Sequence, residues 1–187
     1  MDSELAYLDY TVFLGMNAGE ESVRLRCKAW FALRLERSVA RSRQPTGPAD
    51  GMLLMTWDHV GRCDDLIWRH SRELQDRYYP FMDALHSQPA WRREGYPEST
   101  LRLAAFDARL GELPVLQRML VARALERQAL VYTLDPDLLA QAHLPVRAPP
   151  EADREVAFPP WLETLYRRSL ALRIPQLEPE VVSCITA

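Results

Sequence analysis

The sequence has few cysteines, a single lysine and no long apolar run. Cys27, Cys63 and Cys184 lie far apart and form no Cys-x-x-Cys pair, which argues against a disulfide framework and a structural zinc site. We therefore expect free thiols. No stretch approaches the roughly 18 apolar residues of a membrane-spanning helix, and no cationic segment precedes an apolar stretch near the N-terminus. These absences predict a cytoplasmic protein with no membrane partner.

The overall charge gives no reason to expect nucleic acid as a partner. The formal net charge is -3 and the isoelectric point is near 5.8, so RNA binding would require a local basic patch. Apart from Lys28, every cationic side chain is arginine. That bias is as typical of a GC-rich bacterial genome as of phosphate recognition.

The chain length sets the number of domains. A chain of 187 residues, 48% of them hydrophobic, can bury one full-sized core but is too short for two ordinary domains. We expect one domain over residues 1–150. A C-terminal helix and tail over residues 151–187 should pack on that domain or extend from it.

Short apolar runs indicate where the strands lie. The runs at 52–56 and 129–133 are typical of buried parallel strands, while the longer run 5–14 predicts the first strand and 144–147 the last. Residues 41–51 are rich in turn formers and predict an exposed loop. Helical spacing of apolar residues predicts helices over 20–38, 58–76, 80–86, 99–110, 112–126, 138–142 and 159–172.

The order of these elements predicts an α/β fold. Strands that alternate with helices favour a three-layer α/β/α sandwich around a small, mostly parallel sheet. Trp30 and Phe31 in the helix over 20–38 would suit a stacking platform for a ligand. Their helical spacing favours packing in the core instead.

Residues 88–96 combine aromatic and cationic side chains in an expected loop. Such a loop could stack bases and contact phosphates of RNA, or it could simply pack against the domain, and the sequence supports both interpretations equally. The side chains concerned are Trp91, Arg92, Arg93 and Tyr96.

Three acidic residues are expected at strand ends. Asp9 lies in the first apolar run, and Asp58 and Asp135 follow the next two buried runs. Because ligand sites of parallel sheets lie beyond the carboxyl ends of the strands, we expect the three carboxylates to converge. Converging carboxylates repel one another unless a hard cation such as Mg²⁺ or Mn²⁺ neutralises them. A plainer alternative is that the Asp9 side chain caps a turn with the help of Thr11.

Two segments carry a family resemblance. Asp9-Tyr-Thr-Val-Phe-Leu14 is an acid, a spacer and a hydroxyl residue followed by apolar residues, and residues 122–135 combine an alanine-rich helix, a strand and a Thr-x-Asp run. With the strand that follows at 144–149, the chain resembles the PIN-domain family of metal-dependent ribonucleases over about residues 5–150. Residues 61–65 are also similar to a run in an uncharacterised PIN-like group from GC-rich bacteria, some members of which lie beside specialised-metabolite genes.

The resemblance implies an endoribonuclease in which a metal-bound water attacks the phosphodiester. Asp9, Asp58 and Asp135 would hold one or two Mg²⁺ or Mn²⁺ ions, with Thr133 or Thr11 steadying the ligands. The family has glutamate where this chain has Asp58, and aspartate where it has Gln117. The neutral amide at 117 removes one negative charge and weakens divalent binding.

The same residues support two other functions. A catalytically impaired PIN-like scaffold or accessory protein would use its segment from Pro159 onward to dock a protein partner or a second copy. A metalloenzyme for a small phosphorylated or carboxylated metabolite would bind metal without cleaving RNA. Among the histidines, only His59 lies near the expected site, and packing or solvent exposure accounts for it.

Overall fold

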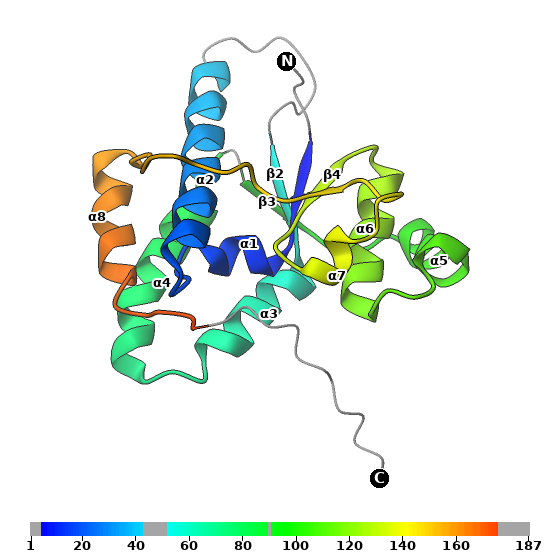
Figure 1. Cartoon of the computed structure of the whole chain (residues 1–187), viewed down its shortest axis with the longest axis horizontal. Helices are drawn as coiled ribbons and strands as arrows, with labels where there is room; N and C mark the ends of the chain where they lie inside the picture. Colours follow the sequence, from blue (N-terminus) through cyan, green and yellow to red (C-terminus); the bar gives the residue numbers. More distant parts are fainter. Residues whose placement is uncertain (1–4, 43–51, 90, 176–187) are drawn as a thin grey trace.

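The structure, a computed structural model, describes residues 5–42, 52–89 and 91–175. Within these residues all strands join one parallel sheet in the order β3-β2-β1-β4-β5 (Figure 1). The predicted α/β fold is therefore confirmed. The strands are β1 (Ala6–Leu8), β2 (Leu53–Thr56), β3 (Trp91–Glu94), β4 (Leu130–Tyr132) and β5 (Val146–Arg147).

Helices cover both faces of the sheet. Figure 1 shows α2, α3, α4 and α8 gathered on one side of the strands and α5, α6 and α7 on the other. No helix of the described ranges is long and apolar enough to cross a membrane. The helices are α1 (Tyr10–Gly15), α2 (Glu21–Ser42), α3 (Trp57–Ile67), α4 (Arg72–His86), α5 (Glu98–Phe106), the short 3₁₀ helix η1 (Ala108–Leu110), α6 (Val115–Glu126), α7 (Pro136–Leu139) and α8 (Pro160–Ser169).

The alternation of side chains along each strand builds two separate cores. Ala6 and Leu8 of β1 belong to the apolar cluster under α2, α4 and α8, whereas Tyr7 between them belongs to the cluster under α5 and α6. Successive residues of a strand point to opposite faces, so a strand buried on both faces reads as a continuous apolar run. This arrangement gives the three-layer sandwich that the sequence predicts.

The first predicted strand is wrong beyond its first residues. Instead of one strand over 5–14, β1 ends at Leu8 and α1 begins at Tyr10. Every residue of α1 is buried, so its sequence carries no polar face, and a short apolar run does not distinguish a buried helix from a buried strand. The helix passes so close to α2 that a Cβ on Gly15 would lie 2.7 Å from the Cys27 sulfur.

The predicted helix over 58–76 is also wrong, because α3 ends at Ile67 and α4 begins at Arg72. The helix expected to begin near Pro80 does not exist as a separate element, since Pro80 lies inside α4. Its side chain is on the exposed side of α4, where water can reach the backbone carbonyl that proline leaves without a donor. The predicted loop over 41–51 lies outside the described residues, apart from 41 and 42, which end α2.

The loop predicted over 88–96 contains an edge strand instead. Trp91–Glu94 pairs in parallel with β2, Leu53 opposite Trp91 and Thr56 opposite Glu94. An edge strand tolerates charged side chains, which is why its sequence lacks the apolar signature of the central strands. Of the predicted free thiols, Cys27 and Cys63 are indeed free and buried.

The C-terminal helix shares the core of the sheet domain. On α8, Tyr166 packs edge-on against Phe81 of α4 at 5.3 Å, and its hydroxyl donates to the Met16 carbonyl at 3.0 Å. The segment after α8 is tied to the loop after α1, where Asn17 donates to the Ser169 carbonyl at 2.9 Å and accepts from the Ile174 N–H at 3.0 Å. Residues 160–174 therefore pack as part of the same core.

A buried lysine links α8 to α2. The ammonium group of Lys28 contacts Glu155 and lies 2.9 Å from a Glu163 oxygen and 4.6 Å from the centre of the Tyr166 ring. The lysine is 1% exposed, so its charge depends on these partners. The only lysine of the chain thus has a structural role.

We expect Lys28→Ala to lower the free energy of unfolding by about 3–5 kcal/mol, because it removes the buried cation and leaves Glu163 paired only with Arg167, which is largely exposed. Chemical unfolding followed by circular dichroism measures the change. The matched control is Arg102→Ala, which removes an exposed cation paired with Glu98 on α5 and should cost no more than about 0.5 kcal/mol. Equal losses in the two variants would contradict the role given to Lys28.

Candidate functional site

The candidate site lies where β1 and β4 end side by side. The two strands pair in register from Ala6 and Leu130 to Leu8 and Tyr132, so Asp9 and Thr133 are the next residues on each. The Asp9 N–H donates to the Tyr132 carbonyl at 3.0 Å and continues the ladder by one bond. Parallel pairing therefore brings together side chains that are more than 120 positions apart.

Two threonines bind one oxygen of Asp9. Its Oδ2 accepts from the Thr11 hydroxyl at 2.8 Å and from the Thr133 hydroxyl. Each hydroxyl oxygen in turn accepts a backbone N–H, Leu134 to Thr11 and Asp135 to Thr133, both at 2.9 Å. Asp9 is at the N-terminal end of α1, but its side chain makes no capping bond to that helix. The alternative in which Asp9 caps a turn is therefore wrong, although Thr11 does contact it.

A histidine faces the other oxygen of Asp9. His59 on α3 places its Nδ1 3.0 Å from Asp9 Oδ1, and both residues are 0% exposed. The same nitrogen lies 3.1 Å from the Tyr10 N–H. Sequence reasoning gave His59 no role. A helix turns about 100° per residue, so α3 directs residue 59 rather than residue 58 toward Asp9.

These contacts keep Asp9 ionised. Burial alone would raise its pKa, but the contact with His59 and the two threonine hydroxyls hold the pKa below its ordinary value. His59 Nδ1 accepts the Tyr10 N–H. Within the described residues, Asp9 Oδ1 and His59 Nε2 have no hydrogen-bond partner, so Asp9 Oδ1 relies on its 3.0 Å contact with His59.

Asp135 and Gln117 form the second half of the site. Asp135 begins α7, and its Oδ1 accepts the N–H groups of Asp137 at 2.9 Å and Leu138 at 3.3 Å. Its Oδ2 accepts from the Gln117 amide on α6 at 3.2 Å. Asp135 is 5% exposed and Gln117 is 7% exposed. Both carboxylate oxygens of Asp135 thus have donors from the chain itself.

Asp58 does not join this group. It is exposed on α3 and lies against Tyr96, whose hydroxyl donates to Thr56 at 2.9 Å. Burial, opposed by the bond to Thr56 and reinforced by the Asp58 charge, raises the Tyr96 pKa to about 12. The structure therefore brings Asp9, Thr133, Gln117 and Asp135 together but leaves Asp58 outside.

The expected metal centre does not fit these side chains. Over residues 5–42, 52–89 and 91–175, no group of three or more His, Cys, Asp or Glu residues is arranged to hold a metal ion. Asp9 is fully buried among its donors, and Gln117 directs an N–H rather than an oxygen at Asp135. A magnesium ion requires several open oxygen ligands and usually retains water molecules. The site satisfies neither requirement.

The predicted RNA contact at Trp91 also needs correction. Trp91 is 5% exposed and stacks on Phe31 of α2 at 5.7 Å with an angle of 17° between the rings, so one face of its ring packs against the core rather than against a base. Arg92 and Arg93 are exposed on β3, and the Arg93 guanidinium lies 5.0 Å from the centre of the Trp57 ring. Aromatic and cationic groups do meet at this edge, but with Trp57 rather than Trp91.

We expect Asp9→Asn to lower the free energy of unfolding near neutral pH by about 3–5 kcal/mol, because His59 and two hydroxyls lose a charged acceptor. A carboxylate whose folded-state pKa is depressed contributes stability above its unfolded pKa of about 4, and that contribution disappears as the pH falls through the folded-state pKa. The gap between wild type and variant should therefore narrow below about pH 4.

Urea unfolding at a series of pH values measures this gap. The control is Asp65→Asn, which removes an exposed carboxylate from α3 and should change stability little at any pH. If Asp9→Asn were as stable as wild type near neutral pH, the contacts of the Asp9 carboxylate would not contribute to the free energy of unfolding, which would contradict the prediction.

Comparison with known proteins gives a family but no function. A comparison with curated proteins finds no match for this chain. A family model described as a family of unknown function (DUF6190) matches residues 1–178. Because that match spans nearly all of the 187 residues, the chain belongs to the DUF6190 family.

Proposed function

We propose that this protein is a catalytically impaired PIN-like scaffold or accessory protein that acts by binding rather than by metal-dependent hydrolysis. The PIN-like part of the proposal rests on the sequence resemblance at Asp9 to Leu14 and at residues 122–135, and the all-parallel sheet is compatible with it. The single observation that carries the loss of activity is that both buried carboxylates at the ends of β1 and β4 are held by side chains and backbone N–H groups of the chain itself.

The bonding of each carboxylate supports this proposal. Metal-assisted hydrolysis requires carboxylate oxygens with open coordination positions and a bound water that can be activated. At Asp9, two hydroxyls bind Oδ2 and the buried His59 ring lies 3.0 Å from Oδ1, and at Asp135 two backbone N–H groups and Gln117 bind the two oxygens. Groups of the chain itself therefore stabilise the negative charge of the carboxylates, as a cation does in a metal site.

The charge of the group leads to the same conclusion. The two buried carboxylates carry two negative charges, and Gln117 adds none where the resembling family has an acid. Asp58 is exposed and oriented toward Tyr96. Fewer and less accessible oxygens lower the affinity for a hard divalent cation.

Metal titration tests the proposal directly. Calorimetry with MnCl₂ at millimolar concentration should give no binding heat, and labelled single-stranded RNA should remain intact in the presence of Mn²⁺. Manganese uptake and RNA cleavage that are both abolished by Asp9→Asn would overturn the proposal in favour of a nuclease. Uptake abolished by Asp9→Asn, without cleavage, would favour a metalloenzyme for a small metabolite.

Restoring an acid at position 117 gives a second prediction. Gln117→Glu keeps the size of the side chain but places a carboxylate beside Asp135, where the amide nitrogen now lies 3.2 Å away. Without metal we expect a loss of about 1–3 kcal/mol in the free energy of unfolding, because a buried hydrogen bond becomes a repulsion. Millimolar Mn²⁺ should raise the melting temperature of this variant but not that of the wild type.

Differential scanning fluorimetry with and without MnCl₂ measures this rescue. The control Gln128→Glu makes the same chemical change at an exposed position after α6 and should show no manganese dependence. A wild type that Mn²⁺ stabilises as much as it stabilises Gln117→Glu would show that the native amide does not prevent metal binding.

A further inference from the structure

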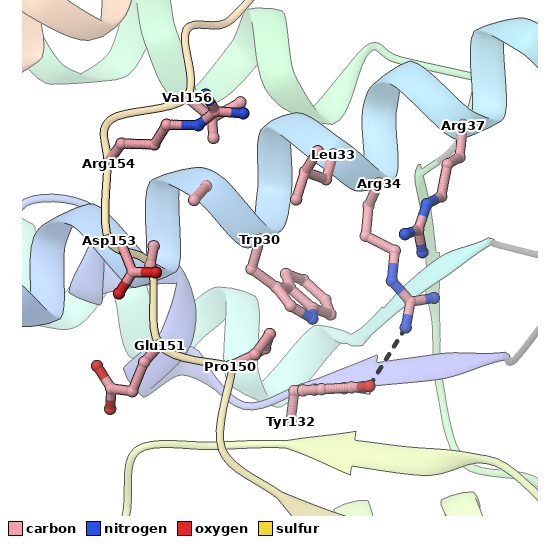
Figure 2. A pocket seen from close by; sticks show the side chains of 12 residues that line it. Trp30, Leu33, Arg34, Arg37, Tyr132, Pro150, Glu151, Asp153, Arg154 and Val156 are labelled. Atoms are coloured by element: carbon pink, nitrogen blue, oxygen red, sulfur yellow. Dashed lines mark hydrogen bonds between the residues drawn. The ribbon is translucent and has the colours of Figure 1, made fainter. Parts of the chain in front are cut away.

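A pocket lies on the α2 face of the sheet, apart from the carboxylates at the strand ends. It has a volume of about 430 Å³ and is enclosed by α2, the end of β4 and the chain segment 150–156 that crosses over them (Figure 2). Pockets of roughly 300–1,000 Å³ hold small organic ligands. None of Asp9, Asp135 or Gln117 lines it.

Two aromatic rings form the floor of the pocket. The rings of Trp30 and Tyr132 lie 4.7 Å apart, and the residues are 5% and 8% exposed. The Arg34 guanidinium lies 5.1 Å from the centre of the Trp30 ring and 5.5 Å from that of Tyr132, and it donates to the Tyr132 hydroxyl at 3.4 Å. The two ring planes are inclined at 47°, so together they form an apolar corner against which a planar aromatic ring can pack.

The two ends of the pocket differ in charge. Arg34 and Arg37, one helical turn apart on α2, lie at one end, and Glu151, Asp153 and Arg154 lie at the other (Figure 2). Glu151 also forms an ion pair with Arg26 at 2.7 Å. Cations and acids balance one another at that end, so an anionic group on a ligand is attracted to the end formed by Arg34 and Arg37.

The indole nitrogen of Trp30 also lies at the arginine end of the pocket. It is turned toward Arg34 and the Tyr132 hydroxyl (Figure 2). An indole N–H is a donor only, so an acceptor placed at this end can bind it together with a guanidinium group.

We propose that this pocket binds a small planar aromatic molecule that carries an anionic group. Its ring lies against Trp30 and Tyr132, and its carboxylate or phosphate lies at the end formed by Arg34 and Arg37, within reach of the Trp30 N–H. The cationic side chains and the indole donor select for negative charge, and the aromatic floor selects for a flat ring. The site is independent of the proposed loss of metal chemistry at the strand ends.

Three probes that share one ring test the proposal. Indole-3-acetate, indole and tryptamine carry negative, zero and positive charge, and calorimetry compares their affinities for the full chain. We expect indole-3-acetate to bind about tenfold more tightly than indole, and tryptamine to bind most weakly, because charge-assisted hydrogen bonds form only with the anion. Binding of tryptamine at least as tight as that of indole-3-acetate would overturn the proposal, and so would no binding of any probe at millimolar concentration.

Variants locate the binding. Arg37→Gln should remove most of the preference for indole-3-acetate over indole, and Arg34→Gln should do the same. The control Arg102→Gln makes the same change on α5 and should retain the preference. If both pocket variants kept the tenfold preference, the anion would not bind at this end and the proposal would fail.

The indole N–H signals in NMR spectra report binding to the wild-type protein. This measurement therefore remains informative if an arginine variant folds poorly. The signal of Trp30, identified by its absence from Trp30→Phe, should shift on addition of indole-3-acetate more than the other tryptophan signals. A shift confined to the other tryptophans would place binding elsewhere and overturn the proposal. Benzoate and phenyl phosphate, compared in the same way, identify the preferred anion, and binding of either supports it.

Discussion

The buried carboxylate of Asp9 is the constraint on which the rest of this site depends. An ionised group that is 0% exposed is tolerated only if the chain supplies its donors. Here β1 and β4 must end in register so that Thr11 and Thr133 reach one oxygen, and α3 must begin directly after β2 so that His59 reaches the other. The order β2-β1-β4 at the centre of the sheet is what makes this possible.

The strand ends around Asp9 differ from the pocket on the α2 face in the ligands that they can bind. Beyond the strand ends, where ligands of parallel sheets usually bind, side chains and backbone N–H groups of the chain hold the two carboxylates. On the α2 face, by contrast, a pocket of about 430 Å³ lies over Trp30 and Tyr132, with Arg34 and Arg37 at one end. Both regions meet at the end of β4, because Tyr132 lines the pocket and Thr133 binds Asp9.

Much of the sheet could be predicted from the sequence because its central strands are buried on both faces. The apolar runs that form β2 and β4 are compatible with few structures other than buried strands. The placement of Asp135 after β4 and of Gln117 on α6 follows from these predicted elements. The sequence could not predict β3, whose stability comes from pairing with β2 rather than from its own apolar pattern. Nor could it predict that His59 rather than Asp58 faces Asp9, because that choice depends on the residue at which α3 begins.

The most direct test of the central claim is anomalous diffraction from a crystal soaked in MnCl₂. The account predicts no manganese peak within coordination distance of Asp9 or Asp135, with both carboxylates still bonded to Thr133, His59 and Gln117. A manganese ion coordinated by both carboxylates, with the threonine and histidine contacts displaced, would contradict it.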